Sequence, residues 1–239
     1  DVCSSDLVPL VSKVCNIRMV PLATDIITSE LTGRPSPVPE LKEQKIPYYG
    51  VKEAVFPFNM FPEVDPVLGP EMRSTGEVLG LSESYGEAFF KAQEAASLKL
   101  PLEGTVLISV NKKDKAEVVD VAKRFHEDGF KIIATGKTCD LLNESGIPAE
   151  KVKKLYEGRP NILDMITNGK IDLVVNSPAG KESVHDDSYL RKAAIKAKIP
   201  YMTTIAAAKA TAEGIGYVKA HMEENNEVKS LQQMHSEIK

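Results

Sequence analysis

The sequence has few cysteines, no long apolar run and no excess of basic residues, and each shortage excludes a class of protein. Its three cysteines, Cys3, Cys15 and Cys139, stand at unrelated spacings that fit neither a disulfide framework nor a zinc site. No apolar run approaches the roughly 18 residues that a membrane-spanning helix needs, and no secretory signal is visible. We therefore expect a cytoplasmic protein without a membrane partner.

The charge balance is mildly acidic, with 30 Lys and Arg against 34 Asp and Glu and a net charge of −4. A general nucleic-acid binder normally carries a basic excess, so we expect no nucleic-acid partner. The 42% hydrophobic and 27% charged content is ordinary for a globular chain. Its 239 residues allow one large domain or two modest ones.

Proline dominates part of the first hundred residues, with eight prolines from Pro35 to Pro70. This spacing prevents long helices and central strands. The pattern predicts a strand-like run over 8–12, a helix over 23–31 ended by Gly33, one strand over 51–56, and loops elsewhere. We expect residues 1–101 to be the last part of a larger domain, and residues 1–7 to be either a non-native leader or a sequencing artefact.

An amphipathic helix is predicted over 82–98, and the linker 101–104 follows it. From Thr105 the pattern changes to a regular alternation of strands and helices. Five βα units in residues 102–239 predict a second domain, an α/β fold built on a five-stranded doubly wound parallel sheet. The predicted strands are 105–110, 131–135, 152–156, 171–177 and 201–204, and the predicted helices are 116–128, 139–145, 161–168, 187–198 and 206–221. We expect the tail after residue 223 to be a frayed helix end.

The stretch Lys131 to Thr138 has the pattern of an anion site. A buried strand stops at Thr-Gly-Lys-Thr and a helix follows, so free N–H groups, hydroxyls and the helix dipole favour a phosphate. Thr138 is either the helix N-cap or a ligand contact. The segment is not a Walker loop, because the spaced glycine that should precede Lys-Thr is absent. Cys139 is either a small residue of the first helical turn or a reactive thiol.

Polar residues follow four of the five predicted strands, at the edge where ligands bind in open α/β sheets. They are hydroxyl, amide and ammonium groups, as a phosphate requires. No Ser–His–Asp set and no metal-ligand cluster is spaced to suggest catalysis. Capping explains Asp186 and Asp187, His126 has the position of a surface residue, and His185 has no evident partner.

The order of these motifs resembles the methylglyoxal-synthase-like domain that regulates the large subunit of carbamoyl-phosphate synthase. The stretches that carry the resemblance are Ser109–Lys115, Gly129–Thr138, Glu157–Pro160, Asp172–Asn176 and Arg191–Ala194. The proline-rich stretch Pro57–Val78 resembles the end of the second ATP-grasp half of that subunit. The resemblance covers about residues 8–214.

By position, the resemblance implies that an effector nucleotide is held by Lys115, Thr135, Thr138, one of Lys153 or Lys154, and Asn176. Lys137 is not a usual family choice, and we expect it to add positive charge there. Pro178 replaces a common hydroxyl residue, which leaves the effector undecided. The resemblance also places Glu53, Tyr201 and Thr203 near an ornithine site.

The family makes carbamoyl phosphate, for pyrimidine and arginine biosynthesis, from bicarbonate, ammonia from glutamine and ATP with Mg²⁺ (or Mn²⁺). The resemblance implies UMP or IMP as effector and, as partners, the rest of the large subunit and a glutaminase small subunit, with oligomerisation through the regulatory domain. The ATP-grasp residues lie upstream in the family, so we expect this chain to bind no ATP and to be inactive alone. The alternatives are a free-standing methylglyoxal synthase, whose catalytic Asp is not found in 177–183, and a non-enzymatic nucleotide sensor.

Overall fold

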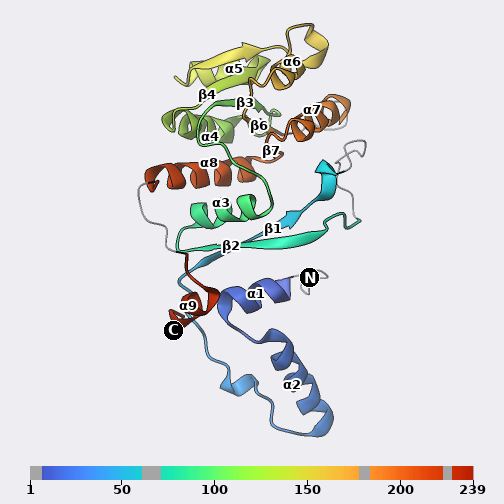
Figure 1. The fold of residues 1–239 in the computed structure, drawn as a ribbon, viewed down its shortest axis with the longest axis vertical. Helices are drawn as coiled ribbons and strands as arrows, with labels where there is room; N and C mark the ends of the chain where they lie inside the picture. Colours follow the sequence, from blue (N-terminus) through green and yellow to red (C-terminus); the bar gives the residue numbers. More distant parts are fainter. Residues whose placement is uncertain (1–6, 61–70, 178–183, 223–227, 239) are drawn as a thin grey trace.

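The computed structural model of the chain describes residues 7–60, 71–177, 184–222 and 228–238. Its elements are stacked in layers along the long axis (Figure 1). A parallel sheet with its helices forms one end, a two-stranded hairpin lies in the middle, and three helices from the two ends of the chain form the other end. The sites discussed below lie on the parallel sheet.

The predicted five-stranded parallel sheet is confirmed. Its order is β5-β4-β3-β6-β7, with every neighbouring pair parallel. After β3 the chain moves outward on one side through β4 and β5, then returns to the other side of β3 for β6 and β7. The strands are β3 (Thr105–Ser109), β4 (Lys131–Thr135), β5 (Ala149–Val152), β6 (Leu173–Asn176) and β7 (Tyr201–Met202).

Helices cover both faces of this sheet, as a doubly wound fold requires. Alternate residues of β3 face opposite sides: Val106 and Ile108 belong to one buried cluster, and Leu107 belongs to the other. The first cluster includes side chains of α4, α5 and α8, and the second includes side chains of α6 and α7. These helices are α4 (Lys115–Glu127), α5 (Gly136–Glu144), α6 (Ile162–Thr167), α7 (Val184–Lys196) and α8 (Ile205–Ala220).

A strand that was not predicted follows the proline-rich segment. β1 (Tyr49–Val55) pairs antiparallel with β2 (Gly76–Ser82), in a stretch predicted as loop. The helix α3 (Tyr85–Ala95) packs against this hairpin on one side and against α8 on the other. Phe89 and Phe90 of α3 therefore share a core cluster with β3, and the apolar core continues across the predicted boundary at residue 101.

The predicted strand-like run at 8–12 is wrong, because these residues belong to the helix α1 (Val8–Cys15). A short apolar run does not by itself distinguish a strand from a helix, and Pro9 in the first helical turn favours the helix. The next helix, α2 (Met19–Thr32), ends as predicted at Gly33, whose φ of 69° is left-handed. Short 3₁₀ turns follow at η2 (Val38–Glu40) and η3 (Pro57–Asn59).

Two other predicted segments are corrected. The strand expected at 152–156 is β5 at 149–152, and residues 155–157 form the 3₁₀ turn η4 (Leu155–Glu157). The tail is not only a frayed end, since it contains the helix α9 (Leu231–Ser236). This helix lies against α1, and the Tyr48 hydroxyl donates a hydrogen bond to Glu237 just beyond it. Burial and the Glu237 carboxylate raise the pKa of Tyr48 to about 12.

The close contact between β2 and α3 predicts a specific effect of adding one methyl group. A Cβ at Gly80 would lie 1.9 Å from the carbonyl oxygen of Ala88, whereas a Cβ at Gly76 on the same strand meets nothing within 4 Å. Gly80→Ala should lower the free energy of unfolding by about 1–3 kcal/mol. Gly76→Ala is the matched control and should change it by less than about 0.5 kcal/mol. Urea denaturation measures both, and equal stability of the two variants would contradict the packing described here.

Candidate functional site

The sheet reverses its direction of winding between β3 and β6, and open α/β sheets bind ligands beyond the strand ends at such a point. The last residues of these two strands, Ser109 and Asn176, are register partners. Ser177 follows, and its hydroxyl accepts hydrogen bonds from the backbone N–H of Asn111 at 3.1 Å and from its Nδ2 at 3.2 Å. Asn176 and Ser177 are both buried. The strand ends thus form a fixed, buried polar edge.

The turn from β4 to α5 carries the predicted Thr-Gly-Lys-Thr motif. The hydroxyl of Thr135 donates to the Ser109 hydroxyl at 2.9 Å and does not cap the helix that follows. The helix predicted from residue 139 begins at Gly136, which has a φ of 34° and open space where a Cβ would stand. Thr138 is therefore a residue of the first helical turn, and the alternative that it is the N-cap is wrong.

Thr138 is only 2% exposed, yet its hydroxyl has no hydrogen-bond partner among the residues that the structure describes. The first backbone N–H groups of an α-helix have no partner within the helix. At α5 no side-chain cap satisfies them. A hydroxyl without a hydrogen bond and uncapped amides at a positive helix terminus together favour an anionic ligand.

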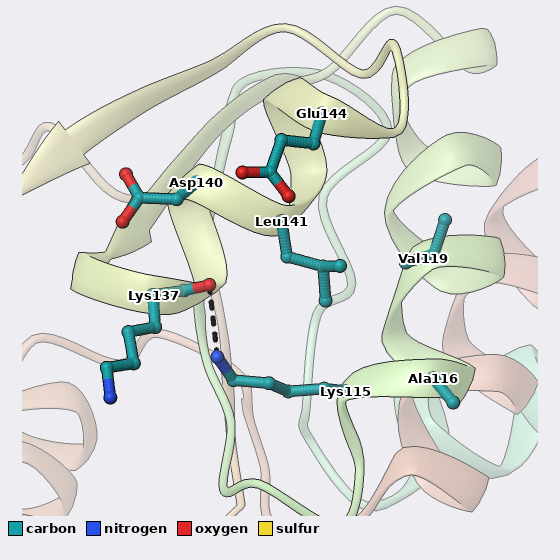
Figure 2. A pocket seen from close by; sticks show the side chains of 7 residues that line it. All are labelled: Lys115, Ala116, Val119, Lys137, Asp140, Leu141 and Glu144. Atoms are coloured by element: carbon teal, nitrogen blue, oxygen red, sulfur yellow. Dashed lines mark hydrogen bonds between the residues drawn. The ribbon is translucent and has the colours of Figure 1, made fainter.

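Two of the predicted lysines meet at this turn. Lys115, at the start of α4, donates its ammonium to the backbone carbonyl of Lys137 at 3.1 Å (Figure 2). The Lys137 side chain extends away from this contact and is exposed. Both lysines line an open pocket of about 410 Å³ between α4 and α5, on whose far side lie Asp140 and Glu144. The two ammonium groups place positive charge beside the first turn of α5.

The structure describes both lysines that the sequence left as alternatives. The Lys153 ammonium reaches the carbonyl of Arg159 at 3.5 Å and the side chain is exposed. Lys154 is half-buried, with its ammonium 5.8 Å from the centre of the Tyr156 ring. Neither makes a described contact with the β4–α5 turn, and the choice between them stays open.

The three residues predicted for a second effector, Glu53, Tyr201 and Thr203, lie in different surroundings. Glu53 on β1 accepts a hydrogen bond from Gln93 of α3 at 2.8 Å, and burial raises the pKa of its carboxyl. Thr203 is exposed. Tyr201 instead joins the first set, because its hydroxyl accepts a hydrogen bond from Asn176 Nδ2 at 2.5 Å. Pro178 lies outside the described residues, as do the side chains of His185, Asp186 and Asp187.

Arg191 on α7 was assigned no function from the sequence. Its guanidinium carbon lies 5.9 Å from the centre of the Tyr201 ring, and its Nε is buried without a hydrogen-bond partner. The only sequence feature that could have drawn attention to Arg191 is its position in a predicted helix, where Lys192 and two alanines follow it. A charged side chain in such a run is ordinary on a helix surface, so the sequence alone does not single it out.

Cys139 is a structural residue of α5, as the simpler of the two sequence interpretations expects. It is buried, its sulfur lies 3.4 Å from the carbonyl oxygen of Ala149, and burial raises the pKa of the thiol. Within the described ranges, no group of three or more His, Cys, Asp and Glu residues is arranged to hold a metal ion. No described helix is both long and apolar enough to cross a membrane.

A known protein family matches the region of the parallel sheet. The family model described as "MGS-like domain" matches residues 117–203, which cover most of the parallel sheet and its edge. The chain therefore contains a methylglyoxal-synthase-like domain.

Longer similarities extend to both sides of that domain. The chain is 43% identical over 99% of its length to the carbamoyl phosphate synthase large chain of Methanothrix thermoacetophila. It is 47% identical over 82% of its length to the C-terminal section of that large chain from Aquifex aeolicus, and 46% identical over 90% to that from Methanopyrus kandleri. It spans 21% of the Methanothrix chain, 36% of the Aquifex section and 40% of the Methanopyrus section. The chain belongs to the carbamoyl phosphate synthase large-chain family and matches part of its C-terminal section.

The burial of Cys139 predicts a slow reaction with thiol reagents. The pKa of the Cys139 thiol is raised, so the folded chain favours the protonated thiol over the thiolate. The contribution of this thiol to the free energy of unfolding is complete below the pKa of the unfolded thiol. It is lost as the pH rises through the pKa of the folded thiol. At mildly alkaline pH, Cys139 should stay unmodified in the native chain and react after unfolding in urea. Peptide mass spectrometry measures this, with the half-buried Cys15 as the internal comparison. Modification of native Cys139 as fast as Cys15 would contradict its burial.

Proposed function

We propose that the carboxyl edge of the parallel sheet binds the phosphate of a nucleoside monophosphate, UMP or IMP, and that this ligand regulates carbamoyl phosphate synthesis elsewhere in a larger enzyme. The observation that carries the proposal is the first turn of α5. There Thr138, a buried residue whose hydroxyl has no partner among the described residues, lies in the first turn of a helix without a side-chain cap. A phosphate dianion would satisfy both kinds of donor at once.

The surroundings of this turn support a charged ligand. Lys115 reaches α5 from α4, and Lys137 adds a second cation on the helix itself. Thr135 and Asn176 hold the ends of β4 and β6 in place through hydrogen bonds to Ser109 and Tyr201. Lys153 or Lys154, from the end of β5, would complete the set of cations. Ligand and donors are then matched by charge at a helix terminus, where the dipole adds to the attraction.

The absence of a recognisable base favours a sensor over a catalyst. None of the described residues near Thr138 forms a hydrogen-bonded pair of nucleophile and base. We place the chemistry, which joins bicarbonate and glutamine-derived ammonia at the expense of ATP with Mg²⁺ or Mn²⁺, in the remainder of the large chain and in a glutaminase partner. Regulation then requires two states of the enzyme with different affinities for the nucleotide. We also propose that the enzyme forms oligomers through this domain.

A second effector with an amino group, such as ornithine, would bind near Glu53, Tyr201 and Thr203. Support for this part comes from Glu53, a half-buried carboxylate on β1 whose pKa is raised by burial. A cationic ligand would stabilise its charged form.

Calorimetric titration of the full chain with inorganic phosphate, UMP and IMP tests the proposal. We expect heat from all three, with the nucleotides binding more tightly than phosphate because they make further contacts. Raising the salt concentration should weaken each interaction, since the donors include exposed lysines. No heat with any of the three ligands would contradict the proposed site.

Substitution of Thr138 locates the phosphate. Thr138→Ala should weaken phosphate binding by roughly 1–3 kcal/mol, the scale of a lost hydrogen bond to a charged group. Ser145→Ala is the matched control, because it removes a hydroxyl that bonds to Leu141 at the other end of the same helix. Unchanged phosphate affinity in Thr138→Ala would move the site to another part of the molecule.

The chain alone should not make carbamoyl phosphate. We expect no ATP-dependent product from bicarbonate with ammonia or glutamine, measured with radiolabelled bicarbonate. Synthesis by the isolated chain would overturn the division between sensor and catalyst.

A further inference from the structure

The C-terminal tail, residues 228–238, lies against the other end of the chain. Its helix α9 contacts the N-terminal helix α1 (Figure 1). Helix α8, the element before α9, lies on the opposite side of the β1–β2 hairpin, in the layer next to the parallel sheet. The layers of α3 and the hairpin stand between α8 and α9. The tail thus brings the end of the chain from the layer of the sheet to the layer of α1.

One face of α9 makes the contacts of the tail. Half-buried side chains recur at the spacing of a single helix face, and the side chains between them are exposed. The half-buried residues are Leu231, Met234, His235 and Ile238. None of the residues of α9 is fully buried. A helix of this length is not stable in water without packing, so the helical structure of the tail depends on its contact with the N-terminal segment.

Two hydrogen bonds attach this face to the N-terminal segment. His235 donates from Nε2 to the carbonyl oxygen of Lys13, in the last turn of α1, at 2.5 Å. The buried Tyr48, directly before β1, donates its hydroxyl to the carboxylate of Glu237. The bond from Tyr48, and then the one from Lys229, lower the pKa of the Glu237 carboxyl. At neutral pH the tail therefore presents an ionised acceptor, which makes the stronger kind of hydrogen bond.

The two attachment points flank the contact between α1 and β1. Val14 of α1 is buried, and a Cβ at Gly50 of β1 would lie only 2.4 Å from its Cγ2. Lys13 precedes Val14 in the sequence, and Tyr48 lies two residues before Gly50. One hydrogen bond of the tail thus goes to each partner of this contact, so α9 spans the junction at which α1 packs on the hairpin.

We propose that the C-terminal tail is a reversible strap, which holds α1 on the start of β1 and releases as one unit while the parallel sheet stays folded. Segments with little buried surface open at a lower free energy than a buried core does. The contrast is large here, because β3 contains side chains that are fully excluded from solvent. Release would remove both hydrogen bonds together, and α1 would lose the support of the tail.

The strap gives the methylglyoxal-synthase-like domain a second connection to the N-terminal segment. The first is the packing of α8 on α3 and of α3 on the hairpin. The second is the tail, which follows α8 and ends on α1 and Tyr48. How firmly α1 is held is therefore set by a segment at the other end of the chain.

Hydrogen exchange of the full chain, measured by mass spectrometry of its peptides, tests the strap. In the native chain we expect the amides of α1 and α9 to exchange faster than those of β3. Tyr48→Phe keeps the ring and removes the hydroxyl, so it should accelerate exchange in both helices by roughly fivefold, the scale of one lost hydrogen bond to a charged group. Deletion of residues 228–239 should accelerate α1 at least as much. Exchange in β3 should be unchanged in both variants.

Ser236→Ala is the matched control in the tail. Ser236 is exposed and its hydroxyl donates to the carbonyl of Gln233 within α9, so its loss should leave exchange in α1 unchanged. Unchanged exchange of α1 in Tyr48→Phe or in the deletion variant would overturn the inference. Equal acceleration of α1 and β3 would overturn it as well, because the tail would then belong to the same cooperative unit as the sheet.

Discussion

Parallel pairing of β3 with both β4 and β6 is the constraint on which the site depends. Since parallel strands all point the same way, their carboxyl ends meet at one edge. There β3 ends at Ser109, β4 at Thr135 and β6 at Asn176. Both faces of β3 are buried, with Val106, Leu107 and Ile108 fully excluded from solvent, so the register of the strand is fixed. The polar edge is thereby held by an apolar core that lies below it.

The same core connects the sheet to the rest of the chain. Phe89 and Phe90 of α3 lie in the cluster that contains β3 and α8, and α3 also carries the β1–β2 hairpin. Gly86 and Gly214 allow α3 and α8 to approach closely, since a Cβ at either would lie 2.9 Å from a backbone oxygen of the other helix. The sheet and β1 are therefore joined by continuous packing through α8 and α3.

Much of this arrangement follows from the sequence. Strands such as 131–135 and helices such as α4 were predicted to within a residue or two, because their apolar periodicity is strong and glycines mark their ends. The Thr-Gly-Lys-Thr turn was also placed correctly at a strand end. The family resemblance added the expected ligands, and the comparisons confirm the family.

Other features depend on contacts that no local pattern records. β2 was missed because its pairing with β1 spans the proline-rich segment, and α1 was misjudged because its eight residues are as apolar as a strand. The hydrogen bond between Asn176 and Tyr201 joins residues 25 positions apart. The Nε of Arg191 is buried without a hydrogen bond because of how α7 packs in the folded chain, and the sequence does not show this.

The central claim is that an anion is held at the first turn of α5. Backbone amide chemical shifts of the labelled chain, recorded during addition of inorganic phosphate, test it most directly. The account predicts that the largest shifts occur at Gly136, Lys137 and Thr138, with smaller ones at Lys115. Shifts concentrated at another helix terminus, or none at all, would contradict it.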